Sequence, residues 1–183
     1  EIYYKFFSSR VSTISAIAPH RENQILKSIQ DITKGQLSLA EASQNVNIGL
    51  SAGFNTEQIE RLSLVSLKAS RALGRNLTDA LQRLLRGTAK LEPELLDELG
   101  IFTRIEPAVQ RYAAELGKAA TSLTNFERRQ AFVNAAIEEG ERKFGIISVS
   151  GTTSQESFEK LYGLSCKFID NIYLYLFQEV HFG

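Results

Sequence analysis

Residues 49–53, with the sequence GLSAG, match the G-x-S-x-G pattern around the nucleophilic serine of α/β-hydrolases. In those enzymes the serine lies on a sharp turn between a strand and a helix, and an acidic residue and a histidine follow later in the chain. Asp170 and His181 follow Ser51 in that order. The residue types therefore allow a serine hydrolase built on Ser51, Asp170 and His181.

The residues before Ser51 favour a different interpretation. Residues 38–48, SLAEASQNVNI, begin with a capping box and continue as a helical pattern, whereas a nucleophile elbow requires a strand. The rest of the chain also predicts helices, so it offers no parallel sheet to hold such a turn. We therefore expect Ser51 in the last turn of a helix, Gly53 as a left-handed cap, and a protein that is not an enzyme. The hydrolase is the alternative.

A second group of reactive side chains is acidic. Four carboxylates occur between residues 92 and 98, namely Glu92, Glu94, Asp97 and Glu98. Pro93 predicts a helix start, and the helix dipole favours carboxylates in a first turn. The interleaved leucines, Leu95, Leu96 and Leu99, form an apolar stripe that turns the acids away from the core. A metal site would need ligands converging from several elements, so we predict a solvated helix face and no metal ligand here.

The composition contains few other ligands. Cys166 is the single cysteine and His20 and His181 are the two histidines, which excludes an internal disulfide and a usual structural zinc site. No phosphate-binding loop or zinc motif occurs, so we predict no cofactor. The 21 basic and 21 acidic residues balance, which gives no indication of a nucleic-acid-binding surface.

The densest basic points are Arg83-Leu84-Leu85-Arg86 and Arg128-Arg129. Acidic residues such as Asp79 and Glu127 lie close to them in the sequence. On a helix, opposite charges four residues apart are neighbours on the surface. We therefore predict surface ion pairs of this spacing for these arginines, and no basic binding site.

The elements that must position all these residues are helices. Apolar residues recur with the helical period, and caps and glycines delimit the segments. This pattern predicts an all-α, compact multi-helix domain of seven to nine helices joined by short loops. Predicted capping boxes begin at Ser38, Thr124 and Thr153, and Asn55 is predicted to begin a further helix. The predicted helices include 21–34, 77–86 and 124–144. The glycines expected at or just beyond helix ends are Gly35, Gly53, Gly74, Gly87, Gly100, Gly117 and Gly145.

The apolar stripes of the three middle segments predict one shared core. Its expected members are Leu81, Leu84, Leu96, Leu99, Phe132 and Ile137. Residues 147–154 are the best loop candidate, so we predict a helical domain over 1–146 and a loop with a C-terminal apolar helix over 147–183. That last helix, 154–178, is apolar nearly all round at its far end, which predicts a contact with another copy of the chain or with the apolar residues 1–7. A membrane surface is the alternative partner, although the apolar run is too short to span a bilayer.

Three long phrases resemble tail tape measure proteins of long-tailed bacteriophages and prophages. They are LSLAEASQNVNIGLSAGFNTEQIERL (37–62), ALGRNLTDALQRLLRGTAKLEPELLDELGI (72–101) and YAAELGKAATSLTNFERRQAFVNAAIEEGERKFG (112–145). They occur in one ordered series, and none of them is a catalytic motif. The chain contains no methionine and begins at Glu1, from which we expect a piece of a longer protein.

The resemblance implies a structural function. Tape measure proteins are long helical chains that lie in several copies in the lumen of the tail tube, set tail length during assembly, and leave before the DNA at genome ejection. It implies as partners other copies of the chain, the tail tube protein and tail assembly or tip proteins, with the host envelope possible during ejection, and no specific nucleic acid. The implied location is the virion, and the host cytoplasm during assembly. An unrelated helical adaptor or membrane-active domain is the further alternative.

Overall fold

The computed structural model describes residues 19–149 and residue 162, with the side chains of 23–149 and Tyr162. These residues form seven α-helices and one 3-10 helix, and they include no strand, which confirms the predicted all-α class. The elements are α2 (Pro19–Ile32), α3 (Leu39–Ser51), α4 (Thr56–Leu73), α5 (Leu77–Lys90), α6 (Pro93–Asp97), α7 (Ile105–Glu115), η1 (Ala120–Ser122) and α8 (Asn125–Phe144).

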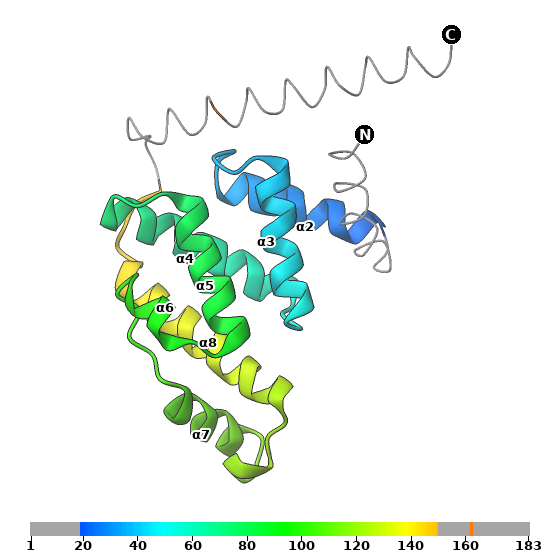
Figure 1. The fold of residues 1–183 in the computed structure, drawn as a ribbon, viewed down its shortest axis with the longest axis vertical. Coiled ribbons are helices and arrows are strands. Elements are labelled where there is room, and N and C mark those ends of the chain that lie inside the picture. Colours follow the sequence, from blue (N-terminus) through cyan, green and yellow to red (C-terminus); the bar gives the residue numbers. More distant parts are fainter. Residues whose placement is uncertain (1–18, 150–161, 163–183) are drawn as a thin grey trace.

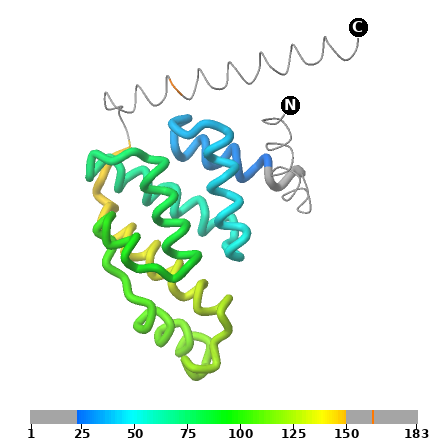
Figure 2. The backbone as a smooth tube through the Cα atoms, in the orientation of Figure 1, coloured from blue at the N-terminus to red at the C-terminus, as the bar shows by residue number. Residues whose placement is uncertain are grey.

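Helices α4 and α5 are the centre of the arrangement (Figure 1). Helix α4 packs against α2, α5 and α8, while α5 also packs against α3 and α6. Helix α7 packs against α8 and η1 at the end of the described part that lies farthest from α2. The backbone therefore runs from α2 to this end and returns along α8 to the central helices (Figure 2).

The main hydrophobic core joins α2 to α6 with α8. All six residues predicted for a shared core belong to it and are fully buried: Leu81, Leu84, Leu96, Leu99, Phe132 and Ile137. A second, smaller cluster fixes α7 on the first half of α8, and its buried members are Val109, Ala113, Leu123 and Ala131. The end of the molecule that carries α7 thus has its own small core.

The predicted capping boxes at Ser38 and Thr124 are present, and the helix start predicted at Asn55 proves to be a capping box as well. The Ser38 hydroxyl accepts from the Glu41 amide, and the Glu41 carboxylate accepts from the Ser38 amide. Asn55 with Gln58, and Thr124 with Glu127, form the same reciprocal pair at α4 and α8. Each box satisfies amides that a helix start leaves without intrahelical acceptors. The third predicted box, at Thr153, lies outside the described residues.

Most of the predicted glycine positions follow helix ends. Gly35, Gly53, Gly74, Gly100 and Gly117 all have positive φ, and Gly74 is the left-handed cap of α4. Gly145 caps α8 with right-handed backbone, at φ −55°. The prediction for Gly87 was wrong, because α5 continues to Lys90 and Leu91 takes the left-handed cap with φ 60°.

Close packing of α6 accounts for Gly87. A Cβ atom added there would lie 3.1 Å from the carbonyl oxygen of Glu92 and 3.2 Å from the Cβ of Leu95, and closer still to a methyl group of Leu96. A glycine in mid-helix costs about 1 kcal/mol relative to alanine. Here it lets the segment after α5 fold back tightly on the same helix. The glycine thus reflects an interhelical contact and not a helix end.

The remaining boundaries differ little from expectation. The first described helix, predicted over 21–34, spans Pro19–Ile32, and α8 ends at Phe144 as predicted. After α8, Ile147 and Val149 pack against the main core. The division of the chain after residue 146 and the apolar helix over 154–178 stay predictions, because residues 150–161 and 163–183 lie outside the described part.

The capping box of α8 gives a testable titration. Hydrogen bonds from the Lys118 ammonium, and from the amide and hydroxyl of Thr124, lower the pKa of the Glu127 carboxyl to about 2. Because this pKa is lower than in an unfolded chain, the contribution to stability is present above about pH 4.5 and is lost as the pH falls toward 2. We expect an NMR titration of the Glu127 side-chain carbon to give a midpoint near 2.

The Lys118→Gln variant checks the cause of this shift. The Lys118 Nζ lies 2.5 Å from the Glu127 Oε1, so removing the ammonium should raise the midpoint. Lys27→Gln, an equal charge change on α2 at the other end of the described part, should leave it in place. A Glu127 midpoint in its ordinary range in the unaltered chain would show that the capping box is not formed in solution.

Candidate functional site

Ser51 lies at a helix end, as predicted. It is the last residue of α3, it is exposed, and Ala52 is the C-cap. Gly53 follows with φ 84°, and the Phe54 amide donates to the Gly49 carbonyl at 2.9 Å. Helix α3 precedes Ser51 where a nucleophile elbow would have a strand. The GLSAG sequence thus forms the C-terminal cap of α3.

A shallow hollow surrounds Ser51. Its other lining residues are Asn47, Ile48, Ala52, Ala89 and Arg129. They come from the end of α3, the last turn of α5 and the second turn of α8. We call this the α3–α5–α8 hollow.

A buried network of side-chain amides holds α8 in place beside the α3–α5–α8 hollow. The Gln130 Nε2 donates to the Gly53 carbonyl at 3.0 Å, and the Gln58 Nε2 donates to the Gln130 Oε1 at 2.9 Å. The same Gln58 nitrogen donates to the Asn134 Oδ1 at 2.8 Å. These bonds link α4, α8 and the turn after α3, so they fix the wall of the hollow that carries Arg129.

The lining of the hollow bears on the hydrolase alternative. A nucleophilic serine needs a base within hydrogen-bond reach, with a third group to orient that base. The residues that line the hollow include neither a carboxylate nor an imidazole. Asp170 and His181 lie outside the described residues, so the structure does not place them relative to Ser51.

We expect a fluorophosphonate probe to leave Ser51 unmodified. A serine hydroxyl without a neighbouring base has its ordinary low reactivity, because the probe reacts with activated nucleophiles. The measurement is intact mass and peptide mapping after exposure, with a known serine hydrolase labelled in parallel. Covalent label on Ser51 that Ser51→Ala abolishes would restore the hydrolase hypothesis.

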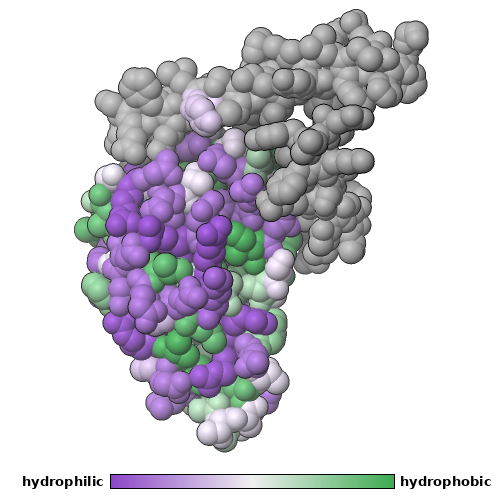
Figure 3. Space-filling view, in the orientation of Figure 1, coloured by the Kyte–Doolittle hydropathy of each residue, from purple (hydrophilic) through white to green (hydrophobic). Residues whose placement is uncertain are grey.

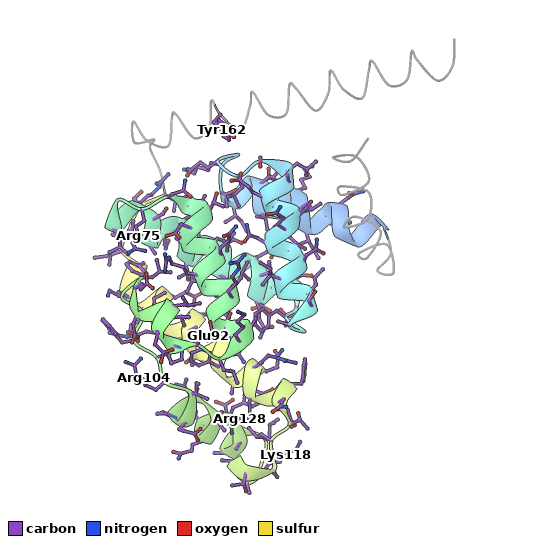
Figure 4. All side chains as sticks on the ribbon, viewed as in Figure 1. Arg75, Glu92, Arg104, Lys118, Arg128 and Tyr162 are labelled. Carbon is purple, nitrogen blue, oxygen red and sulfur yellow. The ribbon has the colours of Figure 1, made fainter. Side chains whose placement is uncertain are left out.

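The acidic group at 92–98 forms ion pairs within the chain. Glu98 pairs with Arg83 and lies 3.8 Å from the Arg75 guanidinium, Asp97 pairs with Arg104 at 2.8 Å, and Glu92 lies 3.9 Å from the Lys90 ammonium. Figure 4 labels Arg75, Glu92 and Arg104 around this region.

The leucines of this segment point the other way. Leu96 and Leu99 are fully buried and Leu95 packs against the main core from a partly buried position. The prediction that the carboxylates at 92–98 face away from the core is therefore confirmed. The arginines that pair with them were not predicted. The described residues hold no group of three or more His, Cys, Asp or Glu side chains that could bind a metal ion.

The four arginines of the two basic segments differ in their ion-pair partners. Arg83 pairs with Asp79 four residues earlier, as predicted, at 3.0 Å. Arg128 pairs instead with Glu106 on α7, at 3.0 Å, and Figure 4 shows it facing that helix. Among the residues that the structure describes, Arg86 and Arg129 have neither an ion-pair partner nor a hydrogen-bond acceptor. The predicted pairing was therefore wrong for Arg86 and Arg129, and for Arg128 the predicted spacing was wrong.

A second hollow, between α7 and α8, was not predicted. Its lining residues are Phe102, Thr103, Arg104, Pro107, Ala108, Arg111, Ala135, Glu138, Glu139 and Arg142. The charges on its walls are paired: Arg111 with Glu138 at 3.1 Å, and Arg142 with Glu139 at 2.6 Å. Phe102 is 62% exposed, with the Lys143 ammonium 5.1 Å from the ring centroid. The sequence offered only Phe102 itself as a signal. A single phenylalanine is too common to identify a site, and its exposure is visible only in the structure.

The rest of the surface is mixed. Large hydrophobic side chains with substantial exposure occur singly on different elements, such as Leu39, Leu116 and Phe126. The face shown in Figure 3 is mostly hydrophilic, with hydrophobic residues in separate patches. Among the described helices, none is both long and apolar enough to cross a bilayer.

No protein-family model matches the chain. No solved structure matches it at a significant level.

Proposed function

We propose that this chain is a structural module of a phage tail tape measure protein, which sets tail length during tail assembly and takes part in genome ejection. The observation that carries the proposal is the ordered series of three phrases that resemble this family, over 37–62, 72–101 and 112–145. Phrases such as KLEPELLDELGI and LTNFERRQAFVNAAIEEG are long enough to be specific.

The arrangement of the helices is consistent with the proposal. The three segments contain α3 with the start of α4, then α5 with α6, then the end of α7 with α8. These elements pack on one another, and most buried residues of the main core come from them. The resembling phrases thus make up one folding unit, which is the form that a helical module of a long structural chain requires.

The proposed partners follow from the same family. They are other copies of the chain, the tail tube protein and the tail assembly or tip proteins, with the host envelope as a partner during ejection. The proposed location is the lumen of the virion tail, and the host cytoplasm while tails assemble. The mechanism is physical: the length of the helical chain determines where polymerisation of the tube stops. It requires neither a cofactor nor a specific nucleic-acid contact.

The test is an in-frame change in the virus or prophage that encodes the chain. We expect deletion of codons 37–145 to shorten the tails and duplication of the same codons to lengthen them. Tail length is measured by electron microscopy, and mass spectrometry of purified tails detects the chain. Absence of the chain from purified tails, or tails of unchanged length after both alterations, would contradict the proposal. If deletion prevents assembly, the duplication alone decides between these outcomes.

A further inference from the structure

Arginines in the described part of this protein are almost all bound to an oxygen of the chain. Arg61 makes a bidentate pair with Glu141 at 2.7 and 2.8 Å, and Arg104 makes one with Asp97 at 2.8 and 3.0 Å. Arg75, Arg83, Arg111, Arg128 and Arg142 also pair with carboxylates. Arg86 and Arg129 are the exceptions among the arginines whose side chains the structure describes.

The two exceptions lie on two of the helices that form the α3–α5–α8 hollow, Arg86 on α5 and Arg129 on α8. Arg129 lines the α3–α5–α8 hollow, and its Nε is buried without an acceptor. Arg86 precedes Ala89, another lining residue, by three positions on α5, so the two are neighbours on the helix surface. A buried donor normally has an acceptor, because leaving it without one forfeits its hydration. Arg129 therefore lacks a counterion at this hollow, and Arg86, an exposed side chain on the adjoining surface of α5, lacks one as well.

The other lining groups define what could supply that counterion. The exposed Ser51 hydroxyl can donate a hydrogen bond, and so can the Asn47 amide. Ile48, Ala52 and Ala89 provide apolar walls. A guanidinium matches a carboxylate through two parallel hydrogen bonds, and apolar walls suit the methylene groups that carry it. A phosphate would gain less from these walls.

We propose that the α3–α5–α8 hollow binds a carboxylate on a short aliphatic stem, with Arg129 as its main donor, Ser51 and Asn47 as further donors, and Arg86 as a second positive charge. A glutamate or aspartate side chain of a partner protein is the ligand of this chemistry. The site is separate from tail-length determination and does not depend on the proposed function. Ser51 is then a ligand-binding residue, where its sequence motif had indicated a nucleophile.

The test is an NMR titration of the isotope-labelled 183-residue chain with glutarate. We expect saturable shifts of the Arg129 Nε–H and the Ser51 amide signals. Arg129→Gln should raise the dissociation constant about tenfold or more, because the charge-assisted bonds from the two terminal nitrogens of the guanidinium, which are not buried as Nε is, are lost. Arg128→Gln is the matched control. It removes the same charge at the neighbouring position, but Arg128 is already paired with Glu106. It should change the dissociation constant less than about twofold, because Glu106 already offsets the charge of Arg128.

Three outcomes would overturn the proposal. They are equal weakening by Arg128→Gln and Arg129→Gln, binding of inorganic phosphate as tight as that of glutarate, and the lack of any saturable shift. The first would show a diffuse electrostatic effect and the second a general anion site. Amide spectra of both variants establish that they are folded. If Arg129→Gln does not fold, Ser51→Ala replaces it, with an expected loss of about threefold in affinity from one hydrogen bond.

Discussion

Replacing Leu96 with alanine is expected to lower the free energy of unfolding by about 2–5 kcal/mol. Leu96 is 0% exposed and belongs to the main core, where α6 packs against α5. Truncation removes buried methyl groups and leaves a cavity that the surrounding helices fill only in part. The measurement is urea-induced unfolding monitored by circular dichroism. The free energies of the variant and the parent chain are compared after checking that their m-values are equal.

Leu73 provides the matched control for this truncation. It is a leucine at the last position of α4, and it is 43% exposed. Leu73→Ala should change the free energy of unfolding by less than about 1 kcal/mol, because much of its side chain already contacts water. Equal effects of Leu73→Ala and Leu96→Ala would show that α6 is not packed on the core in solution. The leucine stripe of α6 would then be a surface available to a partner.

Replacing Gly87 with alanine is expected to destabilise the protein by about 1–2 kcal/mol, although helix propensity alone favours the change. Alanine in mid-helix gains about 1 kcal/mol over glycine. Overpacking a well-packed site costs about 1–3 kcal/mol. The new methyl group would meet Leu96 and lie 3.1 Å from the backbone oxygen of Glu92, which cannot move without shifting α6. We expect the steric cost to exceed the gain in propensity.

A double-mutant cycle tests this explanation. Leu96→Ala removes the side chain that approaches Gly87 most closely, so Gly87→Ala should be less harmful in its presence. We expect the two changes together to cost about 1 kcal/mol less than the sum of the single changes. An increase in stability on Gly87→Ala in the parent chain would contradict the close approach of α6. Strict additivity would show that the Leu96 side chain is not the source of the cost.

The hypotheses about function rest on different kinds of observation. The tape measure proposal comes from long sequence phrases, and the packing of those phrases into one helical unit is consistent with it. The carboxylate site comes from the geometry of one hollow, whose lining residue Arg129 has no acceptor although most of the other described arginines have one. Tail-length measurements test the first and ligand titration tests the second, so either can fail without the other.

The helix boundaries that the sequence predicted correctly depend on local interactions. Ser38 and Glu41 are three residues apart, and so are Thr124 and Glu127, so each capping box involves one turn of chain. A left-handed cap such as Gly74 depends on the backbone freedom of a single residue. Helical periodicity likewise assigns the buried face from neighbours within two turns. These features can therefore be predicted without knowing where any helix packs.

The tertiary structure decided whatever depends on residues far apart in the sequence. Gly87 was assigned to a helix end because nothing nearby shows that α6 folds back on it. The partner of Arg61, Glu141, lies 80 residues away, and Arg83 reaches Glu98 across the turn between two helices. The hollow around Ser51 likewise combines residues from α3, α5 and α8. The sequence could indicate Ser51 and Arg129 separately, but only the packing of three helices brings them to one surface, because their proximity depends on contacts between distant segments.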